Sequence, residues 1–104
     1  MIAAISDRDF DAVVERSKMP VLVEFWKPGC GSCLALTRQL ELLDRELDGR
    51  VRIVAMNVEE NFQIPSELEV ESLPALALYR HGRFERFIGG IGSKDEIRKK
   101  LGLP

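Results

Sequence analysis

Hydrophobic and polar residues alternate along this chain of 104 residues with two periods, one typical of helices and the other typical of strands. Apolar residues three or four positions apart, with polar residues between them, predict helices. Residue types that favour helix N-caps stand at Ser6, Asp7 and Ser93, and Gly49 stands where a long helix should stop. Four helices are therefore expected, within residues 6–20, 30–49, 61–68 and 93–101.

Shorter runs rich in β-branched and aromatic residues predict strands. Val21–Trp26 is apolar on both faces, which is typical of a buried central strand. A second run covers residues 51–58, and the β-α-β arrangement that it completes favours a parallel pair. The last two runs, 76–79 and 84–88, flank a turn centred on His81-Gly82 and therefore predict an antiparallel hairpin.

The order of these elements predicts an α/β fold built on a central mixed β-sheet that is flanked by helices on both faces. The expected order is β-α-β-α-β-α-β-β-α. Its first strand would precede the first helix, where the sequence shows no clear run of β-branched and aromatic residues. The chain contains no linker, repeat or low-complexity stretch. Residues 1–104 are therefore expected to form a single domain.

Composition excludes several classes of function. Apolar residues make up 45% of the chain and charged residues 31%, as in globular proteins rather than disordered or membrane proteins. A net charge of -2 and a pI near 5.4 give no basic surface, so neither nucleic acid nor a membrane is an expected partner. The amino terminus lacks the basic region of a secretory signal, which predicts a cytoplasmic protein.

Two cysteines, Cys30 and Cys33, enclose Gly31 and Ser32 at the junction of a buried strand and a long helix. The first amides of a helix lack intrahelical partners and the helix dipole is positive there, so the pKa of the Cys30 thiol should be lowered. A Cys30 thiolate can attack a disulfide, and Cys33, one turn further on, can then attack Cys30 and release the reduced substrate. Gly31 leaves room for a substrate beside the sulfur. The pair thus indicates thiol–disulfide exchange.

Two other interpretations of the close cysteine pair remain: half of a zinc site, or two core cysteines without redox function. Zinc normally takes four ligands, and beyond the pair the chain offers only His81 and carboxylates. A metal or cluster site would therefore need the cysteine pairs of two chains. We expect no bound metal and no other cofactor.

Three segments resemble the thioredoxin family: Phe25-Trp26, Cys30-Gly31-Ser32-Cys33 and Leu73-Pro74-Ala75-Leu76. The element order extends this resemblance over the whole chain, which implies a thioredoxin fold and an enzyme that reduces protein disulfides. The implied partners are disulfide-containing protein substrates and a separate electron-donating reductase, whose identity the sequence does not specify. A monomer without a bound cofactor is expected.

The resemblance also implies roles for residues outside the cysteine pair. Pro74 would be a cis-proline that lies against the active-site disulfide, and Leu73 would present its backbone to substrates. Glu24 stands where the family usually carries a buried aspartate. Burial would raise the pKa of Glu24 and allow its carboxylate to take the proton from Cys33. Trp26 would pack beside the active-site loop.

The chain departs from the family pattern around the sulfur atoms. Gly29, Ser32 and Leu34 stand where members commonly carry a tryptophan, a proline and a lysine. The Ser32 hydroxyl could bond a thiolate or an amide and alter the reduction potential. Gly29, together with Gly89 and Ile91 in a later glycine-rich loop, is expected to contact substrates. These departures suggest a distinct partner set, and they leave a binding module with little reductase activity as the alternative function.

Overall fold

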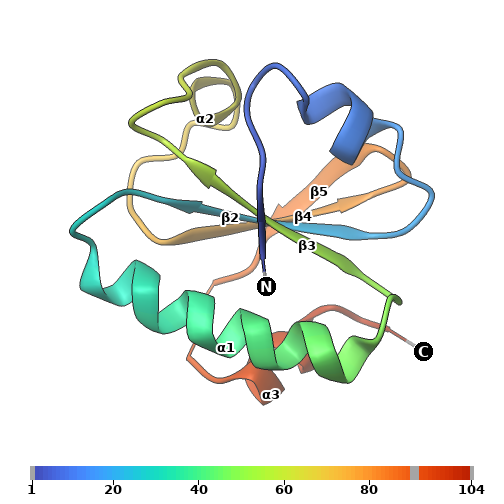
Figure 1. Cartoon of the computed structure of the whole chain (residues 1–104). Coiled ribbons are helices and arrows are strands. Elements are labelled where there is room, and N and C mark those ends of the chain that lie inside the picture. Colours follow the sequence, from blue (N-terminus) through green and yellow to red (C-terminus); the bar gives the residue numbers. More distant parts are fainter. Residues whose placement is uncertain (1, 90–91, 104) are drawn as a thin grey trace.

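The central sheet has five strands in the order β1-β3-β2-β4-β5, in a computed structural model that describes residues 2–89 and 92–103 (Figure 1). The middle strand pairs in parallel with one neighbour and antiparallel with the other, so the sheet is mixed, as expected. The short first strand is the one that the hydrophobic pattern did not locate. The strands are β1 (Ala3–Ala4), β2 (Val21–Trp26), β3 (Arg52–Asn57), β4 (Ala75–Arg80) and β5 (Arg83–Phe87).

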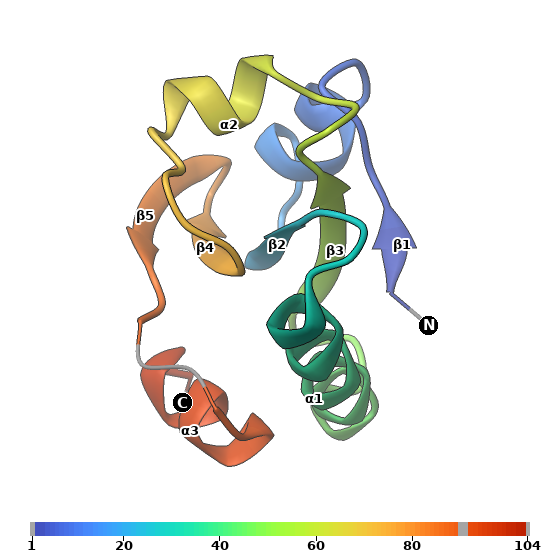
Figure 2. The same cartoon turned by 90° about the vertical axis from the view of Figure 1, so that its left-hand side faces the viewer.

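Helices cover both faces of this sheet, which confirms the expected architecture (Figures 1 and 2). One face carries the long helix α1 (Gly31–Leu47) and the last helix α3 (Lys94–Lys100). The opposite face carries the π-helical turn η1 (Asp11–Glu15) and the short helix α2 (Gln63–Glu67). Within the described residues, no helix is long and apolar enough to cross a membrane.

The hydrophobic core has two parts, one on each face of the sheet. Strand β2 contributes to both because its alternate side chains point to opposite faces: Leu22 packs with α1 and α3, whereas Val23 and Phe25 pack on the other side. On that other side, the ring of Phe10 makes an edge-on contact with Tyr79, with ring centroids 5.3 Å apart. The double-sided burial confirms that β2 is the central strand.

The first predicted helix forms only in part. Ser6 and Asp9 exchange hydrogen bonds, the N–H of each donating to the side-chain oxygen of the other, and so begin a series of turns. At the end of η1 the N–H of the C-cap residue Arg16 donates to the Asp11 carbonyl at 2.9 Å, a π-helical rather than an α-helical bond. The helical stretch is therefore shorter than the spacing of its apolar residues predicts.

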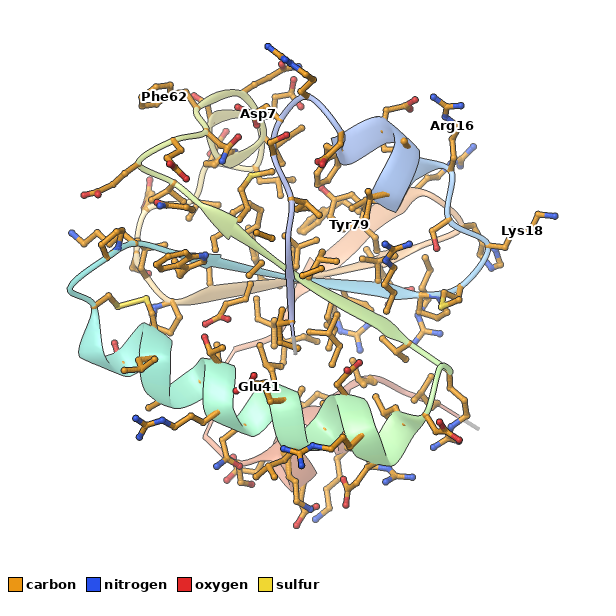
Figure 3. The ribbon with its side chains drawn as sticks, in the orientation of Figure 1. Asp7, Arg16, Lys18, Glu41, Phe62 and Tyr79 are labelled. Carbon is orange, nitrogen blue, oxygen red and sulfur yellow. A yellow bond between two sulfur atoms is a disulfide. The ribbon has the colours of Figure 1, made fainter. Side chains whose placement is uncertain are left out.

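Asp7 caps a different helix from the one that its position in the sequence suggests. Its two carboxylate oxygens accept hydrogen bonds from the N–H groups of Gln63 and Ile64, both at 2.9 Å, at the start of α2. The Asp7 N–H donates to the side-chain oxygen of Asn61 at 2.8 Å. The amino-terminal segment is thus joined to α2, and Figure 3 shows Asp7 beside that helix.

The ends of α1 and α3 agree with the sequence signals. Helix α1 ends at Leu47, and its C-cap residue Asp48 adopts a left-handed conformation (φ 45°) directly before Gly49 (φ 83°). Ser93 caps α3 by accepting a hydrogen bond from the Glu96 N–H at 3.3 Å. These caps confirm the stop expected at Gly49 and the start expected at Ser93.

The hairpin between β4 and β5 is closed by His81 and Gly82, both with positive φ, as the sequence predicts. Gly82 also meets a second requirement, because the turn lies against η1. A Cβ atom at this position would overlap the backbone carbonyl of Glu15. Glycine is therefore needed here for space as well as for backbone conformation.

We expect Gly82→Ala to destabilise the protein by about 2 kcal/mol or more, because the variant combines an unfavourable φ with a collision against fixed backbone. Gly49→Ala is the matched control, since φ is also positive there but the space around its Cβ is open. The control should lose only about 1 kcal/mol. Urea unfolding measures both values, and equal losses would show that contact with η1 does not constrain the turn.

Candidate active site

The loop from β2 to α1 places the cysteine pair at the start of α1. Gly29 has a φ of 80°, and Cys30 is the N-cap residue, whose sulfur accepts a hydrogen bond from the Cys33 N–H at 3.1 Å. Cys30 and Cys33 form a disulfide with their Cα atoms 5.2 Å apart, drawn as a yellow bond at the beginning of α1 in Figure 3. The Cys30 sulfur thus lies where the helix offers unpaired amides and a positive dipole.

The two cysteines differ in their access to solvent. Cys30 is partly exposed, whereas only 2% of Cys33 is exposed. Gly31 and Ser32 between them are exposed, and beyond the adjacent residues and the helix backbone no atom lies within 4 Å of the place where a Cβ of Gly31 would stand. The Ser32 hydroxyl oxygen lies 3.5 Å from the Cys30 sulfur. A disulfide of another protein can therefore approach Cys30 but not Cys33.

Glu24, in the middle of β2, is fully buried on the face covered by α1. Its neighbours on the adjacent strands are Ala55 and Leu76, which carry no charge. Burial raises the pKa of Glu24 to about 7, although a hydrogen bond from Thr37 partly opposes the rise. Glu24 is thus a buried acid whose pKa lies near neutrality, as the resemblance implied.

Thr37 is a residue of the site that the sequence analysis missed. Its hydroxyl oxygen lies 2.7 Å and 3.0 Å from the two carboxylate oxygens of Glu24 and 2.9 Å from the carbonyl oxygen of Cys33. The available signal was its position four residues after Cys33, because that spacing puts a hydroxyl on the otherwise apolar, buried face of the helix. Thr37 joins the carboxyl of β2 to the cysteine turn of α1.

Leu73 and Pro74 lie at the same end of the sheet as the cysteine loop. Strand β4 runs antiparallel to β2 and pairs Ala75 with Phe25, so the residues before Ala75 lie beside the end of β2. The Leu73–Pro74 peptide bond is cis, as the resemblance implied, and both residues are partly buried. The topology therefore brings this segment to the edge at which α1 begins.

Gly89 reaches the same end of the sheet from β5. The Ile88 N–H donates to the Leu76 carbonyl at 2.8 Å, which continues the pairing with β4 beyond Phe87. Gly89 follows directly and is exposed. Ile91, the other residue expected in this loop, lies outside the described residues.

A cavity of about 520 Å³ opens on the β3 side of the cysteine pair. Trp26 lines it together with loop residues, and so do Ala55 of β3 and Cys33 and Thr37 of α1. Lys27 is the one charged residue in its wall, as far as the described residues show. Among all residues that the structure describes, no three His, Cys, Asp or Glu side chains lie close enough together to hold a metal ion.

The fold and the paired cysteines define a thiol–disulfide oxidoreductase, and comparison with known proteins agrees. The family model for thioredoxin matches residues 1–102. The chain is 42% identical to a thioredoxin of Haemophilus influenzae over 79 residues, which cover 76% of this chain and 74% of that protein. It is 36% identical to a thioredoxin of Rickettsia felis (89% of each chain) and 32% identical to one of Rickettsia bellii (93% and 92%).

The chain therefore belongs to the thioredoxin family. It is a protein-disulfide reductase whose redox-active pair is Cys30 and Cys33.

The raised pKa of Glu24 predicts that the stability of the oxidised protein depends on pH. The folded state holds a proton on Glu24 up to about pH 7, whereas the unfolded chain releases it near pH 4.5, so stability falls as the pH rises between these values. The loss should reach up to about 3 kcal/mol. Glu24→Gln, which cannot ionise, should lack this loss.

Urea unfolding of the oxidised protein and of oxidised Glu24→Gln at several pH values from 4 to 8 measures this difference. The free energy of unfolding of Glu24→Gln, relative to that of the natural protein, should increase as the pH rises across this range. A constant difference would mean that Glu24 titrates alike in the folded and unfolded states, contrary to its burial.

Proposed function

We propose that Cys30 is the attacking thiol and Cys33 the resolving thiol of this reductase. The observation that carries this assignment is the unequal exposure of the two residues: Cys30 is accessible, whereas Cys33 is buried. The N-cap position of Cys30 supports the same order, since a thiolate there accepts an amide hydrogen bond and faces the positive end of the helix.

The reaction begins when the Cys30 thiolate attacks one sulfur of a substrate disulfide. A bond forms between Cys30 and that sulfur, and the other substrate sulfur leaves as a thiolate. The Cys33 thiolate then attacks the Cys30 sulfur, closes the protein disulfide and releases the second substrate thiolate, and both substrate thiolates take protons from water. The substrate gains two electrons and the dithiol of the protein loses them.

Glu24 acts in the second step as the base that takes the proton from the Cys33 thiol. A thiol must lose its proton before it attacks, and Cys33 is shielded from bulk water by its burial. A base with a pKa near 7 holds a proton or releases it with equal ease at neutral pH, which suits this role. Glu24 is bonded to the cysteine turn through Thr37, which supports the assignment.

Substrates bind across the end of the sheet at which the cysteine loop meets the segment before β4. Gly29, Leu73, Pro74 and Gly89 contact the substrate chain in this proposal, and Ile91 joins them because it belongs to the same glycine-rich loop of the sequence as Gly89. Backbone pairing supports the assignment, because it brings the segments before β4 and after β5 to this edge. Trp26 supports the loop from the cavity side.

The electrons return to the pair from a separate enzyme, a thioredoxin reductase, and the chain needs no bound cofactor. We propose that residues 1–104 work as a single domain and as a monomer in the cytoplasm. The match of the thioredoxin family model over residues 1–102 supports this proposal.

Cysteine-to-serine variants test the assignment. Reduced Cys33→Ser should attack a disulfide-bonded protein such as insulin and stop at the mixed disulfide, because nothing resolves it. Cys30→Ser should form no adduct. Gel electrophoresis without reductant detects the adduct, and dithiothreitol should remove it.

An adduct with Cys30→Ser and none with Cys33→Ser would reverse the two roles. If the natural protein fails to reduce insulin and neither variant forms an adduct, the alternative function as a binding module takes the place of reductase activity.

A further inference from the structure

The hydroxyl of Thr37 has more hydrogen-bond acceptors within reach than it has protons. Its oxygen lies within 3.0 Å of both Glu24 carboxylate oxygens and of the Cys33 carbonyl oxygen. A hydroxyl donates one hydrogen bond and accepts up to two. Thr37 can therefore donate to Glu24 or to Cys33, but not to both at once.

The protonation state of Glu24 decides between these two arrangements. When Glu24 is ionised, its carboxylate is the stronger acceptor, because hydrogen bonds to charged groups are the stronger ones. When Glu24 is protonated, its own O–H can donate to the Thr37 oxygen, and the Thr37 proton is then free for the Cys33 carbonyl. Both arrangements leave the buried carboxyl with a partner, in keeping with the absence of unsatisfied buried polar side chains in the described residues.

Glu24 depends on Thr37 for this partnership. Strand β3 presents Ala55 beside Glu24 and strand β4 presents Leu76, neither of which titrates or forms side-chain hydrogen bonds. Helix α1 contributes Cys33, which can titrate only once the disulfide is reduced, and Thr37 is the one hydrogen-bond partner of the carboxyl in the described part of the chain. No charged side chain there contributes to the pKa shift of Glu24.

Thr37 also lies between this carboxyl and the cavity beside the cysteine pair. Thr37 and Cys33 both line the cavity, whereas Glu24 is fully buried and is not part of its wall. A proton that reaches Glu24 therefore needs a route to water, and the Thr37 hydroxyl provides the contact between the carboxyl and the cavity. Ala55, the neighbour of Glu24 on β3, also lines the cavity.

We propose that Thr37 is a positioning residue whose hydroxyl turns between Glu24 and the Cys33 carbonyl, holds the carboxyl in both protonation states and passes its proton to water in the cavity. In the transfer, the Thr37 hydroxyl turns its proton away from the Cys33 carbonyl toward a water molecule; its oxygen then receives the Glu24 proton as it gives its own proton to that water, so one proton leaves Glu24 and Thr37 is chemically unchanged. The inference rests on the proposed role of Glu24 as the base for Cys33.

Thr37→Val tests the inference, because valine has nearly the shape of threonine but no hydroxyl. The pKa of Glu24 should rise in this variant, since the carboxylate loses a hydrogen bond that favours its charged form. The rate of mixed-disulfide resolution should fall about tenfold, the usual effect of losing a hydrogen bond to a charged group. Thr37→Ser keeps the hydroxyl and should restore both values.

Two measurements separate the proposed relay from a merely structural role. Infrared spectroscopy of the carboxyl band follows the Glu24 titration, with Glu24→Gln identifying the band. Rapid-mixing kinetics with a disulfide-bonded peptide give the resolution rate as a function of pH. If Thr37→Val does not fold, as its urea midpoint would show, Thr37→Ala replaces it in the same comparison with Thr37→Ser.

Glu24→Gln in the same kinetic experiment distinguishes the two possible failures. If Glu24→Gln resolves as fast as the natural protein, the proposed role of Glu24 is wrong and the inference about Thr37 fails with it. If Glu24→Gln is slow but the hydroxyl-free variant keeps the natural rate and the natural Glu24 titration, only the inference about Thr37 is overturned. If the hydroxyl-free variant resolves the mixed disulfide slowly and Thr37→Ser resolves it at the natural rate, the inference is supported.

Discussion

The hydrogen bonding of β2 to a strand on each side fixes the position of the whole site. Because β2 runs parallel to β3 and antiparallel to β4, its carboxyl end meets the beginning of β4. Helix α1 starts a few residues beyond that end, so its first amides and the cysteine pair arrive beside the Leu73–Pro74 segment. A change that weakens either pairing would disturb the site without touching a sulfur atom.

Glu24 shows how function and stability oppose each other in this fold. A carboxylate in the middle of an apolar strand would be costly as an ion, and the protein lowers that cost by keeping the group partly protonated near neutral pH. The same feature makes Glu24 useful as a proton acceptor beside a buried thiol. Thr37 limits the cost further by giving the carboxyl one hydrogen-bond partner.

Local sequence signals were sufficient for the elements whose ends are set locally. The strand predicted at Val21–Trp26 has those bounds in the structure, and the long helix ends next to Gly49 as expected. The first helix was predicted too long, and the carboxylate of Asp7 caps α2 more than fifty residues away, a contact that no local pattern reveals.

In the site, too, the residues with a local sequence signal could be predicted, and those that depend on contacts between distant elements could not. Its cysteines and Glu24 could be found from the motif and from a charge inside an apolar run. Thr37 could not be identified from the sequence, because a threonine in a helix is ordinary and its partner Glu24 lies on another element. The cavity beside the pair was likewise out of reach, since its wall combines β1, β3 and α1.

The reduction potential of the Cys30–Cys33 pair tests the central claim most directly, that these two sulfurs exchange electrons with other thiols. Equilibration with glutathione and dithiothreitol buffers, followed by thiol trapping, gives the fraction of oxidised protein at each potential. We expect a reversible two-electron couple more reducing than the glutathione pool. A pair that shows no reversible couple would contradict the account.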